Sequence, residues 1–377
     1  MEITVLGWYG TETIGDRAIL AGILHILSKA SGDILNIRLG SLYVPLCVRT
    51  KIEDEAFWRK ITNNRYGRCT IFNSLSTREL KENISKSDIV MIGGGPLMDI
   101  ESMFMLKYAF SFAKKRRIKT VLMGCGWGDF YIDKYRAVGA ELVALSDLSI
   151  FRDDTSAREA IKYNNGRNDI KGLIDPAFIA AYWFRKNQNN PPTRSYNCIN
   201  LREMFITDAK QKGRFCIKDC EGVINQLLDI YPEHSIRLIP MHTFCIGGDD
   251  RIILNKVTHR IGSDRLLVQN KPLSLEETMS VYYNAKICVG MRFHSVVLQT
   301  VLNGCNYIMD YTEPTRGKTI NVLRQLNLVD TYQDRYMHYD NINSFNISLD
   351  VKKVEINDEI LSKYLEDYVE SIKRVML

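Results

Sequence analysis

The chain has 377 residues, and at about 150 residues per domain this length predicts two domains or one large one. A composition of 45% hydrophobic and 25% charged residues excludes a disordered, collagenous or low-complexity polypeptide. Fifty Lys and Arg residues against 44 Asp and Glu residues leave a net charge of +6, which is weak evidence for a nucleic-acid partner and fits an anionic small molecule or a membrane surface equally well.

The first 180 residues alternate short apolar, β-branched runs with amphipathic segments. This alternation is typical of repeated βα units around a parallel sheet. Strands are predicted at residues 3–6, 34–39, 89–92, 120–123 and 148–151. A helix is predicted at 17–29, with Asp16 placed directly before it as a good N-cap residue.

A polar stretch, RKNQNNPPTR at residues 185–194, interrupts the alternation and marks a domain boundary. Strands are predicted again at residues 197–201, 236–239, 266–268, 287–289 and 307–309. The last helix, about 358–376, carries an apolar stripe that must dock on one of the two domains. We therefore predict an N-terminal α/β domain at 1–184, a linker at 185–194, a C-terminal α/β domain at 195–345, and a tail with the docking helix at 346–377.

Three glycine-rich segments follow predicted strands of the first domain, at residues 7–16, 93–99 and 124–129. Ligands of open α/β sheets bind beyond the carboxyl ends of the strands, so these segments are candidate binding loops. The first, GWYGTETIGD, lacks the GxGxxG spacing of a dinucleotide site. A tight turn capped by Asp16 is an equally good interpretation of it.

The second and third segments carry more specific signals. In GGGPLMD, the glycines, among them Gly94 and Gly95, leave no side chains to obstruct a ligand, and Asp99 can accept hydrogen bonds from sugar hydroxyls. In GCGWGD, Trp127 offers a flat apolar surface for a sugar ring, with Asp129 close by. Packing of the indole against a loop is the alternative interpretation.

The strongest candidate is GMRFHS at residues 290–295, which follows a strand and precedes an apolar helix. In an extended segment, residues two apart point to the same side, so we expect Arg292 and His294 to face one ligand while Phe293 packs inward. A guanidinium can bind a carboxylate or phosphate through two hydrogen bonds, and an imidazole can move a proton near neutral pH. The alternative is an arginine paired with an acid and a histidine that caps the helix.

Two further residues of the second domain follow predicted strands. His242 lies in IPMHTFCIGGDD and is either a substrate contact or a structural histidine. Arg202, in NLRE, can add a second cation to the site around Arg292. No histidine or cysteine has convincing metal-ligand spacing, since Cys216 and Cys220 lie one helical turn apart without a further ligand pair.

Taken in succession, these motifs resemble the polysaccharide pyruvyl transferase family. The resemblance covers most of the chain, through GWYGTETIGDRAIL, GGGPLMD, GCGWG, SIFRDDTSA, DPAF, INLRE, LIPMHTFCIGGDD and GMRFHSVVLQTVLNG. It implies an α/β fold of two Rossmann-like domains that face each other across a cleft, in the glycosyltransferase B type architecture.

The resemblance also implies an activity, the transfer of the pyruvyl unit of phosphoenolpyruvate onto two hydroxyls of a sugar. The product is a pyruvate ketal in a cell-surface polysaccharide, and no metal or redox cofactor takes part. His294 is the implied catalytic proton donor. The implied donor-binding residues, all in the second domain, are Arg202, Arg292, His242 and Ser295.

The acceptor is expected on the first domain. Its expected binding residues are Asp16, Gly94, Gly95, Asp99, Trp127 and Asp129. The first loop departs from the family pattern, because Thr13 and Ile14 stand where an asparagine is common before Gly-Asp. The third loop departs from it as well, because Trp127 replaces a small or apolar residue. These departures concern the acceptor more than the donor.

Two other functions stay open on the sequence, a glycosyltransferase with a nucleotide-sugar donor and a non-catalytic saccharide-binding subunit. Nine scattered cysteines, no signal peptide and no apolar run of about 20 residues predict a cytoplasmic protein. The basic run at residues 114–117 suggests peripheral contact with the inner membrane surface and a lipid-linked acceptor, although a solvated helix end explains it as well.

Overall fold

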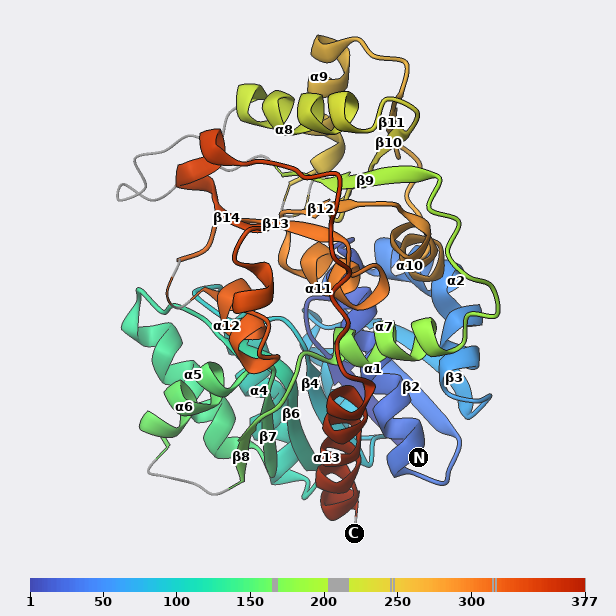
Figure 1. Cartoon of the computed structure of the whole chain (residues 1–377). Coiled ribbons are helices and arrows are strands. Elements are labelled where there is room, and N and C mark those ends of the chain that lie inside the picture. The colour runs from blue at the N-terminus through green and yellow to red at the C-terminus, as the bar shows by residue number, and fades with distance from the viewer. Residues whose placement is uncertain are drawn as a thin grey trace. The chain divides into compact units, whose positions relative to one another are not determined.

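The computed structural model of the chain describes residues 1–164, 169–202, 217–244, 246, 248–313, 315 and 317–376. Its internal contacts divide the chain into two compact α/β units (Figure 1). Unit 1 consists of Met1–Glu12, Asp16–Trp183 and Asn357–Leu377, and unit 2 of Thr13–Gly15 and Phe184–Ile356.

Unit 1 is built around a parallel sheet. Its strands are β1 (Glu2–Leu6), β2 (Leu35–Ser41), β3 (Tyr66–Asn73), β4 (Ile89–Gly93), β5 (Pro96–Leu97), β6 (Lys119–Trp127), β7 (Leu148–Phe151) and β8 (Ile170–Gly172). Its helices are α1 (Ile14–Ala30), α2 (Val44–Ile61), α3 (Thr77–Ile84), α4 (Ser102–Lys115), α5 (Asp133–Leu145), α6 (Asp154–Lys162), α7 (Pro176–Lys186) and α13 (Asp358–Met376). The main strand order is β3-β2-β1-β4-β6-β7-β8, and β5 pairs with β6.

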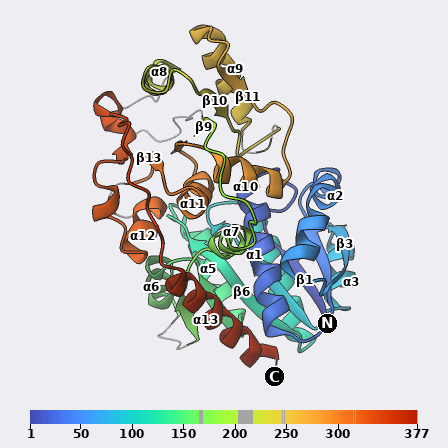
Figure 2. The same ribbon diagram turned by 45° about the vertical axis from the view of Figure 1, so that its right-hand side comes forward.

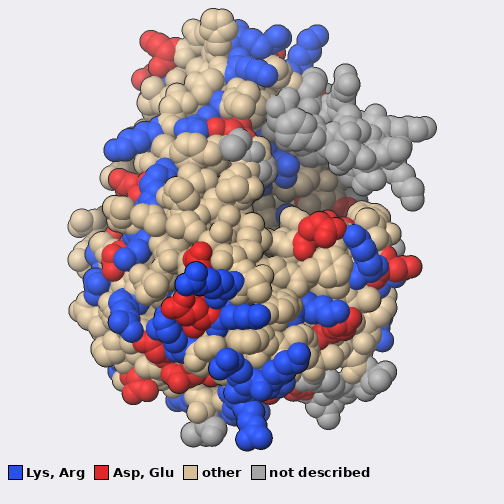
Figure 3. Space-filling model, turned by 180° about the vertical axis from the view of Figure 1, so that it is seen from behind, with Lys and Arg blue, Asp and Glu red and all other residues tan. Residues whose placement is uncertain are grey.

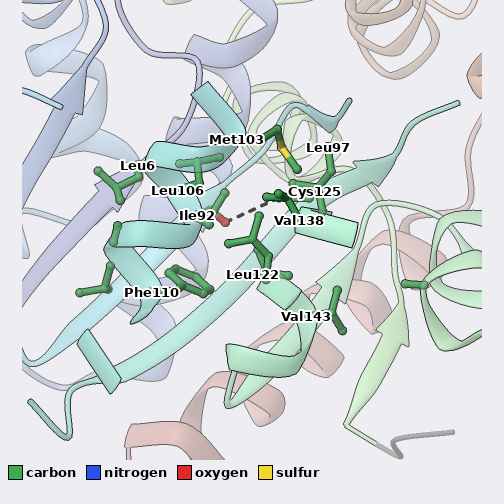
Figure 4. Packing of buried hydrophobic residues seen from close by; sticks show 14 of the residues in the cluster. Leu6, Ile92, Leu97, Met103, Leu106, Phe110, Leu122, Cys125, Val138 and Val143 are labelled. Carbon is green, nitrogen blue, oxygen red and sulfur yellow. Dashed lines mark hydrogen bonds between the residues drawn. The ribbon is translucent and has the colours of Figure 1, made fainter. Parts of the chain in front are cut away.

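One face of this sheet is covered by α3, α4, α5 and α6, which supply a continuous hydrophobic core. Figure 4 shows part of it, with Leu106 and Phe110 of α4 near Ile92 of β4 and Leu122 of β6. The Cys125 thiol also lies in this core, and its Sγ atom is 3.7 Å from the Ile92 carbonyl oxygen. Complete burial raises the pKa of this thiol to about 12, so it serves as an apolar side chain.

The C-terminal helix α13 packs on unit 1 (Figures 1 and 2). Its buried Tyr368 donates a hydrogen bond of 2.6 Å to the Ile174 carbonyl oxygen, and its Ser371 accepts one of 2.9 Å from Lys171. The predicted tail is therefore divided between the units, since residues up to Ile356 belong to unit 2. The predicted linker needs correction at its start, because α7 continues through Lys186.

Unit 2 contains a second parallel sheet. Its strands are β9 (Tyr196–Asn200), β10 (Ser235–Leu238), β11 (Leu266–Val268), β12 (Cys288–Gly290), β13 (Asn306–Asp310) and β14 (Tyr336–His338). Its helices are α8 (Ile217–Ile230), α9 (Asp250–Ile261), α10 (Leu275–Asn284), α11 (Phe293–Leu302) and α12 (Lys318–Gln325), with short 3₁₀ turns η1 (Asp330–Tyr332) and η2 (Tyr339–Ser344). The strand order is β11-β10-β9-β12-β13-β14.

Each sheet has a point at which the order of its strands reverses. In unit 1 this switch point lies between β1 and β4, and in unit 2 it lies between β9 and β12. Loops diverge there at the carboxyl ends of the strands and leave room for a ligand. Among the described residues, no helix is both long and apolar enough to cross a membrane.

Candidate functional site

The space beside the glycines after β4 is occupied by the protein's own side chains. Gly94 and Gly95 both have φ of +73°, which side chains other than glycine rarely adopt. A Cβ atom on Gly94 would collide with Ile19, and one on Gly95 would collide with Trp8. The sequence interpretation, that these glycines keep space for a ligand, is therefore incomplete, because close packing already requires them.

Asp99 caps a backbone turn in unit 1. Its Oδ2 atom accepts hydrogen bonds from the amides of Tyr131, at 2.8 Å, and Ile132, at 3.2 Å. Among the described residues, its Oδ1 atom accepts no hydrogen bond. The carboxylate thus holds the segment before α5 and keeps one oxygen that could accept from a hydroxyl.

Trp127 is the last residue of β6, so most of the predicted third loop is strand. Its ring stacks on Tyr163 with 5.7 Å between centroids and meets Phe130 and Phe151 edge-on. The indole is therefore one member of an aromatic cluster and is half-buried in it. Asp129, two residues later, is exposed.

The first glycine loop differs from the prediction at its end. Helix α1 begins at Ile14, so Asp16 lies in its first turn and is not its N-cap. A carboxylate in the first turn still interacts favourably with the positive end of the helix dipole. Thr11 Oγ1 donates a 3.5 Å hydrogen bond to it.

In unit 2, Asn200 ties together three strand ends at the switch point. It is fully buried at the end of β9 and lies opposite Gly290 of β12. Its Oδ1 atom accepts from the Arg292 amide at 3.0 Å, and its Nδ2 atom donates to the Ile239 carbonyl at 2.9 Å. The loops after β9, β10 and β12 are thereby held in one arrangement.

Arg292 is locked to a carboxylate. Its Nε donates to Asp250 Oδ2 at 2.8 Å and its Nη2 to Asp250 Oδ1 at 2.6 Å, with Arg292 only 8% and Asp250 only 2% exposed. Asp250 also accepts the amides of Met241 and His242. The alternative interpretation of an arginine paired with an acid thus describes the geometry, and the pair fixes the His242 segment next to α11.

The sequence suggested that Arg292 and His294 lie together on an extended segment, and the structure shows that they do not. Helix α11 begins at Phe293, so Arg292 is its extended N-cap residue and His294 is in its first turn. The half-buried His294 ring lies against Gly15, where a Cβ atom would collide with the imidazole. The Ile14 amide nearby donates to the Met241 carbonyl at 3.0 Å, which holds residues 13–15 in unit 2.

Ser295 is fully buried within α11. Its hydroxyl donates a 2.7 Å hydrogen bond to the Arg292 carbonyl oxygen. Ser295 therefore stabilises the start of the helix and positions its neighbours, and it is not exposed to a ligand.

Two residues that the sequence did not single out, Tyr311 directly after β13 and Lys318, lie with the predicted Arg202 in one cluster. Arg202 Nη1 donates to the Tyr311 hydroxyl at 3.1 Å, and its guanidinium lies over the ring at 4.9 Å from the centroid. Lys318, the first residue of α12, lies 5.7 Å from the Tyr311 centroid and 5.5 Å from that of Phe293. We call Arg202, Tyr311 and Lys318 the tyrosine cluster.

Positive charges dominate the surroundings of the Tyr311 phenol. Burial acts to raise the pKa of the Tyr311 phenol, but the charges of Lys318, Arg202 and Arg292 outweigh burial and lower this pKa to about 8. Perturbed groups of this kind gather at functional sites. The cluster therefore favours negative charge beyond the carboxyl ends of β9, β12 and β13.

Sequence reasoning also passed over a buried charge in unit 1. Arg152 follows β7 and is buried, with Asp153 and Asp175 carboxylate oxygens each 3.9 Å from its guanidinium. The tripeptide RDD was a usable signal, because a charged residue directly after an apolar strand stands where ligands bind. Tyr311 gave a weaker signal, since tyrosine is common after strands for packing reasons.

Comparisons with known proteins give the family from a family model and the fold from solved structures. A family model described as polysaccharide pyruvyl transferase matches residues 14–303. No curated protein matches the chain. The UDP-N-acetylglucosamine 2-epimerase from Rickettsia bellii is similar in structure, with a TM-score of 0.57, 11% identity, and coverage of 100% of this chain and 96% of that one. The UDP-GlcNAc 2-epimerase from Neisseria meningitidis, solved bound to UDP-GlcNAc, has a TM-score of 0.53 and 10% identity, and the match covers 99% of this chain and 100% of that one. These likenesses confirm two Rossmann-like domains of the glycosyltransferase B type.

Proposed function

The chain belongs to the polysaccharide pyruvyl transferase family, and we propose that it transfers the pyruvyl unit of phosphoenolpyruvate onto two hydroxyls of a sugar. The donor carries a carboxylate and a phosphate. The observation that supports this donor best is the tyrosine cluster, in which Arg202 and Lys318 surround one phenol at the switch point of unit 2. Charge-assisted hydrogen bonds to such cations are the usual means of binding phosphate.

The reaction needs a proton donor near the methylene carbon, and we assign this role to His294. Protonation of that carbon leaves an electrophilic centre at the carbon that bears the phosphate. One sugar hydroxyl adds there, the bond to the phosphate oxygen breaks, and the second hydroxyl closes the ketal. Of the two hydroxyl protons, one is balanced by the proton in the new methyl group and the other leaves with inorganic phosphate. The reaction requires no metal or redox cofactor.

Arg292, Ser295 and His242 contribute mainly by position in this proposal. The Arg292 guanidinium is bound to Asp250, and its charge still contributes to the potential at Tyr311. Ser295 holds the Arg292 carbonyl, and Asp250 holds the amide of His242. These contacts keep the first turn of α11, and therefore His294, in one orientation.

The acceptor sugar is proposed to bind at the strand ends of unit 1. The buried Oδ1 atom of Asp99 accepts no hydrogen bond from the described residues and is proposed to accept one from a sugar hydroxyl, and the partly exposed Trp127 is proposed to contact a ring. Asp129 is accessible, and Asp16 lies at the start of α1. Gly94 and Gly95 bring backbone close to this region without side chains of their own.

A lipid-linked acceptor would bring the enzyme to the inner membrane surface, and the basic run at the end of α4 supports this part of the proposal. Lys115 is exposed there, Lys114 pairs with Asp147 at 2.6 Å, and Arg116 lies over the Phe112 ring. Lysine and arginine side chains also gather at the bottom of the view in Figure 3, where no single residue is labelled. Such charges attract anionic headgroups.

A ligand panel followed by turnover tests the proposal. We expect phosphoenolpyruvate to raise the melting temperature, because it binds only the folded protein, and nucleotide sugars to leave it unchanged. With a saccharide acceptor, inorganic phosphate should be released and a ketal methyl group should appear in the product. Release of a nucleoside diphosphate would establish a glycosyltransferase. Saccharide binding without phosphate release, even with varied acceptors, would favour a saccharide-binding subunit.

A further inference from the structure

Tyr311 is the residue of the tyrosine cluster that has no role in the reaction as proposed. It lies directly after β13, next to β12 in the sheet, and its hydroxyl accepts the 3.1 Å hydrogen bond from Arg202. Lys318 lies on the same ring from α12. The phenol oxygen therefore lies beside two cations beyond the strand ends of unit 2.

The charged groups that face Tyr311 come from several elements. Arg202 approaches from the end of β9, Lys318 from α12, and Arg292 from the start of α11, where Asp250 offsets its charge. The nearest carboxylate on its own strand, Asp310, is engaged by uncharged donors, because Thr312 and Tyr336 hydroxyls bind it at 2.7 Å each.

One more titratable group lies on the neighbouring strand. His338 of β14 bonds the Thr312 carbonyl through Nε2 at 3.0 Å and pairs with Asp340 through Nδ1 at 3.2 Å. The imidazole ring of His338 therefore contacts the Thr312 carbonyl and the Asp340 carboxylate. Neither Asp310 nor His338 supplies the negative charge that the cations around Tyr311 favour.

An ionised Tyr311 would supply that charge from within the protein. A phenolate between Arg202 and Lys318 and an incoming phosphate or carboxylate would then compete for the same cations. The phenolate and a bound anion are like charges and repel each other. Binding of the anion therefore favours the neutral phenol, which can also donate a hydrogen bond to it.

We propose that Tyr311 belongs to the donor site and takes up a proton when an anionic phosphorylated ligand binds between Arg202 and Lys318. The proposal rests on the proposed function for the identity of the ligand as phosphoenolpyruvate, but the proton uptake requires only an anion. The proton comes from solvent and forms the phenol O–H bond as the phenolate loses its interaction with the two cations.

The free phenol loses half its protons at a pH of about 8, so the sign of the pH dependence follows. Below that pH the phenol is neutral and binding needs no proton. Above it, the phenolate must take up a proton from solvent for each anion that binds, so affinity falls by about tenfold per pH unit.

Calorimetry in two buffers of different ionisation enthalpy measures this directly, with inorganic phosphate and phosphoenolpyruvate as probes. At pH 8 we expect an uptake of about half a proton per bound anion in the wild type and none in Tyr311→Phe, which keeps the ring. The ratio of wild-type to Tyr311→Phe affinity should fall about tenfold between pH 7 and pH 9.

Tyr231→Phe is the matched control, since burial raises the pKa of Tyr231 to about 12 and its hydroxyl binds the Ser348 carbonyl. It should take up the same fraction of a proton as the wild type. The ultraviolet absorbance of tyrosinate gives a second readout: one tyrosine should ionise near pH 8, its midpoint should rise with phosphate, and it should be absent from Tyr311→Phe.

The outcomes separate this inference from the proposed function. Binding of phosphoenolpyruvate with no proton uptake overturns the role of Tyr311 and leaves the function intact. Phosphate binding with uptake, but no phosphoenolpyruvate binding, supports the role of Tyr311 and overturns the donor. If neither probe binds, or if Tyr311→Phe takes up the same fraction of a proton as the wild type, the inference is wrong.

Discussion

The residues at the carboxyl ends of the strands differ between the two units. In unit 1 the segment after β4 is glycine-rich, and its glycines are needed because Trp8 and Ile19 pack against them. In unit 2 the segments after β9, β12 and β13 carry Arg202, Arg292 and Tyr311. A glycine run after a strand thus indicates close packing first, whereas the cations gathered around an ionisable group mark the place where we propose that the donor binds.

The largest expected effect concerns chemistry in unit 2. His294→Ala removes the proposed proton donor, so phosphate release should fall by about 100- to 10,000-fold while phosphoenolpyruvate affinity changes little. Phosphate release and calorimetry measure the two quantities. His259→Ala, at the exposed end of α9, is the control and should behave like the wild type. A fully active His294→Ala enzyme would refute the assignment.

The next effect concerns stability in unit 2. Arg292→Ala leaves Asp250 buried without its partner, so the free energy of unfolding should fall by about 3–5 kcal/mol. Urea unfolding measures it. Asp250→Ala should cost a comparable amount, because it leaves the guanidinium uncompensated. If Arg292→Ala kept full stability and lost only donor affinity, the arginine would be a direct ligand and not a positioning residue.

Unit 1 offers the matching test of the glycine interpretation. Gly95→Ala places a methyl group against Trp8 at a φ of +73°, so unfolding should become easier by about 2–4 kcal/mol. Gly222→Ala, in α8 with open space around it, should instead gain about 0.5–1 kcal/mol. A stable Gly95→Ala protein that had lost only acceptor binding would restore the original interpretation of an open ligand loop.

The smallest effect isolates donor affinity. Arg202→Ala should weaken phosphoenolpyruvate binding by about 10- to 100-fold, the cost of one charge-assisted hydrogen bond, with little change in melting temperature. Arg237 makes a similar contact elsewhere in unit 2, with its guanidinium 3.7 Å from the Tyr196 centroid. Arg237→Ala is therefore the control, and equal loss of affinity in both variants would contradict a specific role for Arg202.

Hydrophobic alternation predicted the inner strands β1, β2, β4, β6, β7, β9, β10, β12 and β13 and the edge strand β11, and it missed β3, β5, β8 and β14. Three of the missed strands, β3, β8 and β14, lie at sheet edges in the described topology, where less surface is buried and the apolar run is broken, as in YGRCTIFN. The fourth, β5, has only two residues, too few to show an alternation. Helix α13 was predicted with its observed bounds because its apolar stripe is long and regular.

The candidate site was less accessible to sequence reasoning because its decisive contacts are long-range. Asp250 lies 42 residues from Arg292, and Tyr311 lies 109 residues from Arg202. Nothing local identifies either pairing. The sequence also predicted the start of α11 too late. The segment Phe293–Ser295 was interpreted as extended, whereas the helix already begins at Phe293.

A crystal structure of the chain soaked with phosphoenolpyruvate would show where the donor binds. We expect an anionic group of the ligand within hydrogen-bond distance of Arg202 and the Tyr311 hydroxyl in unit 2. A ligand bound at the strand ends of unit 1, with the tyrosine cluster unchanged, would contradict it.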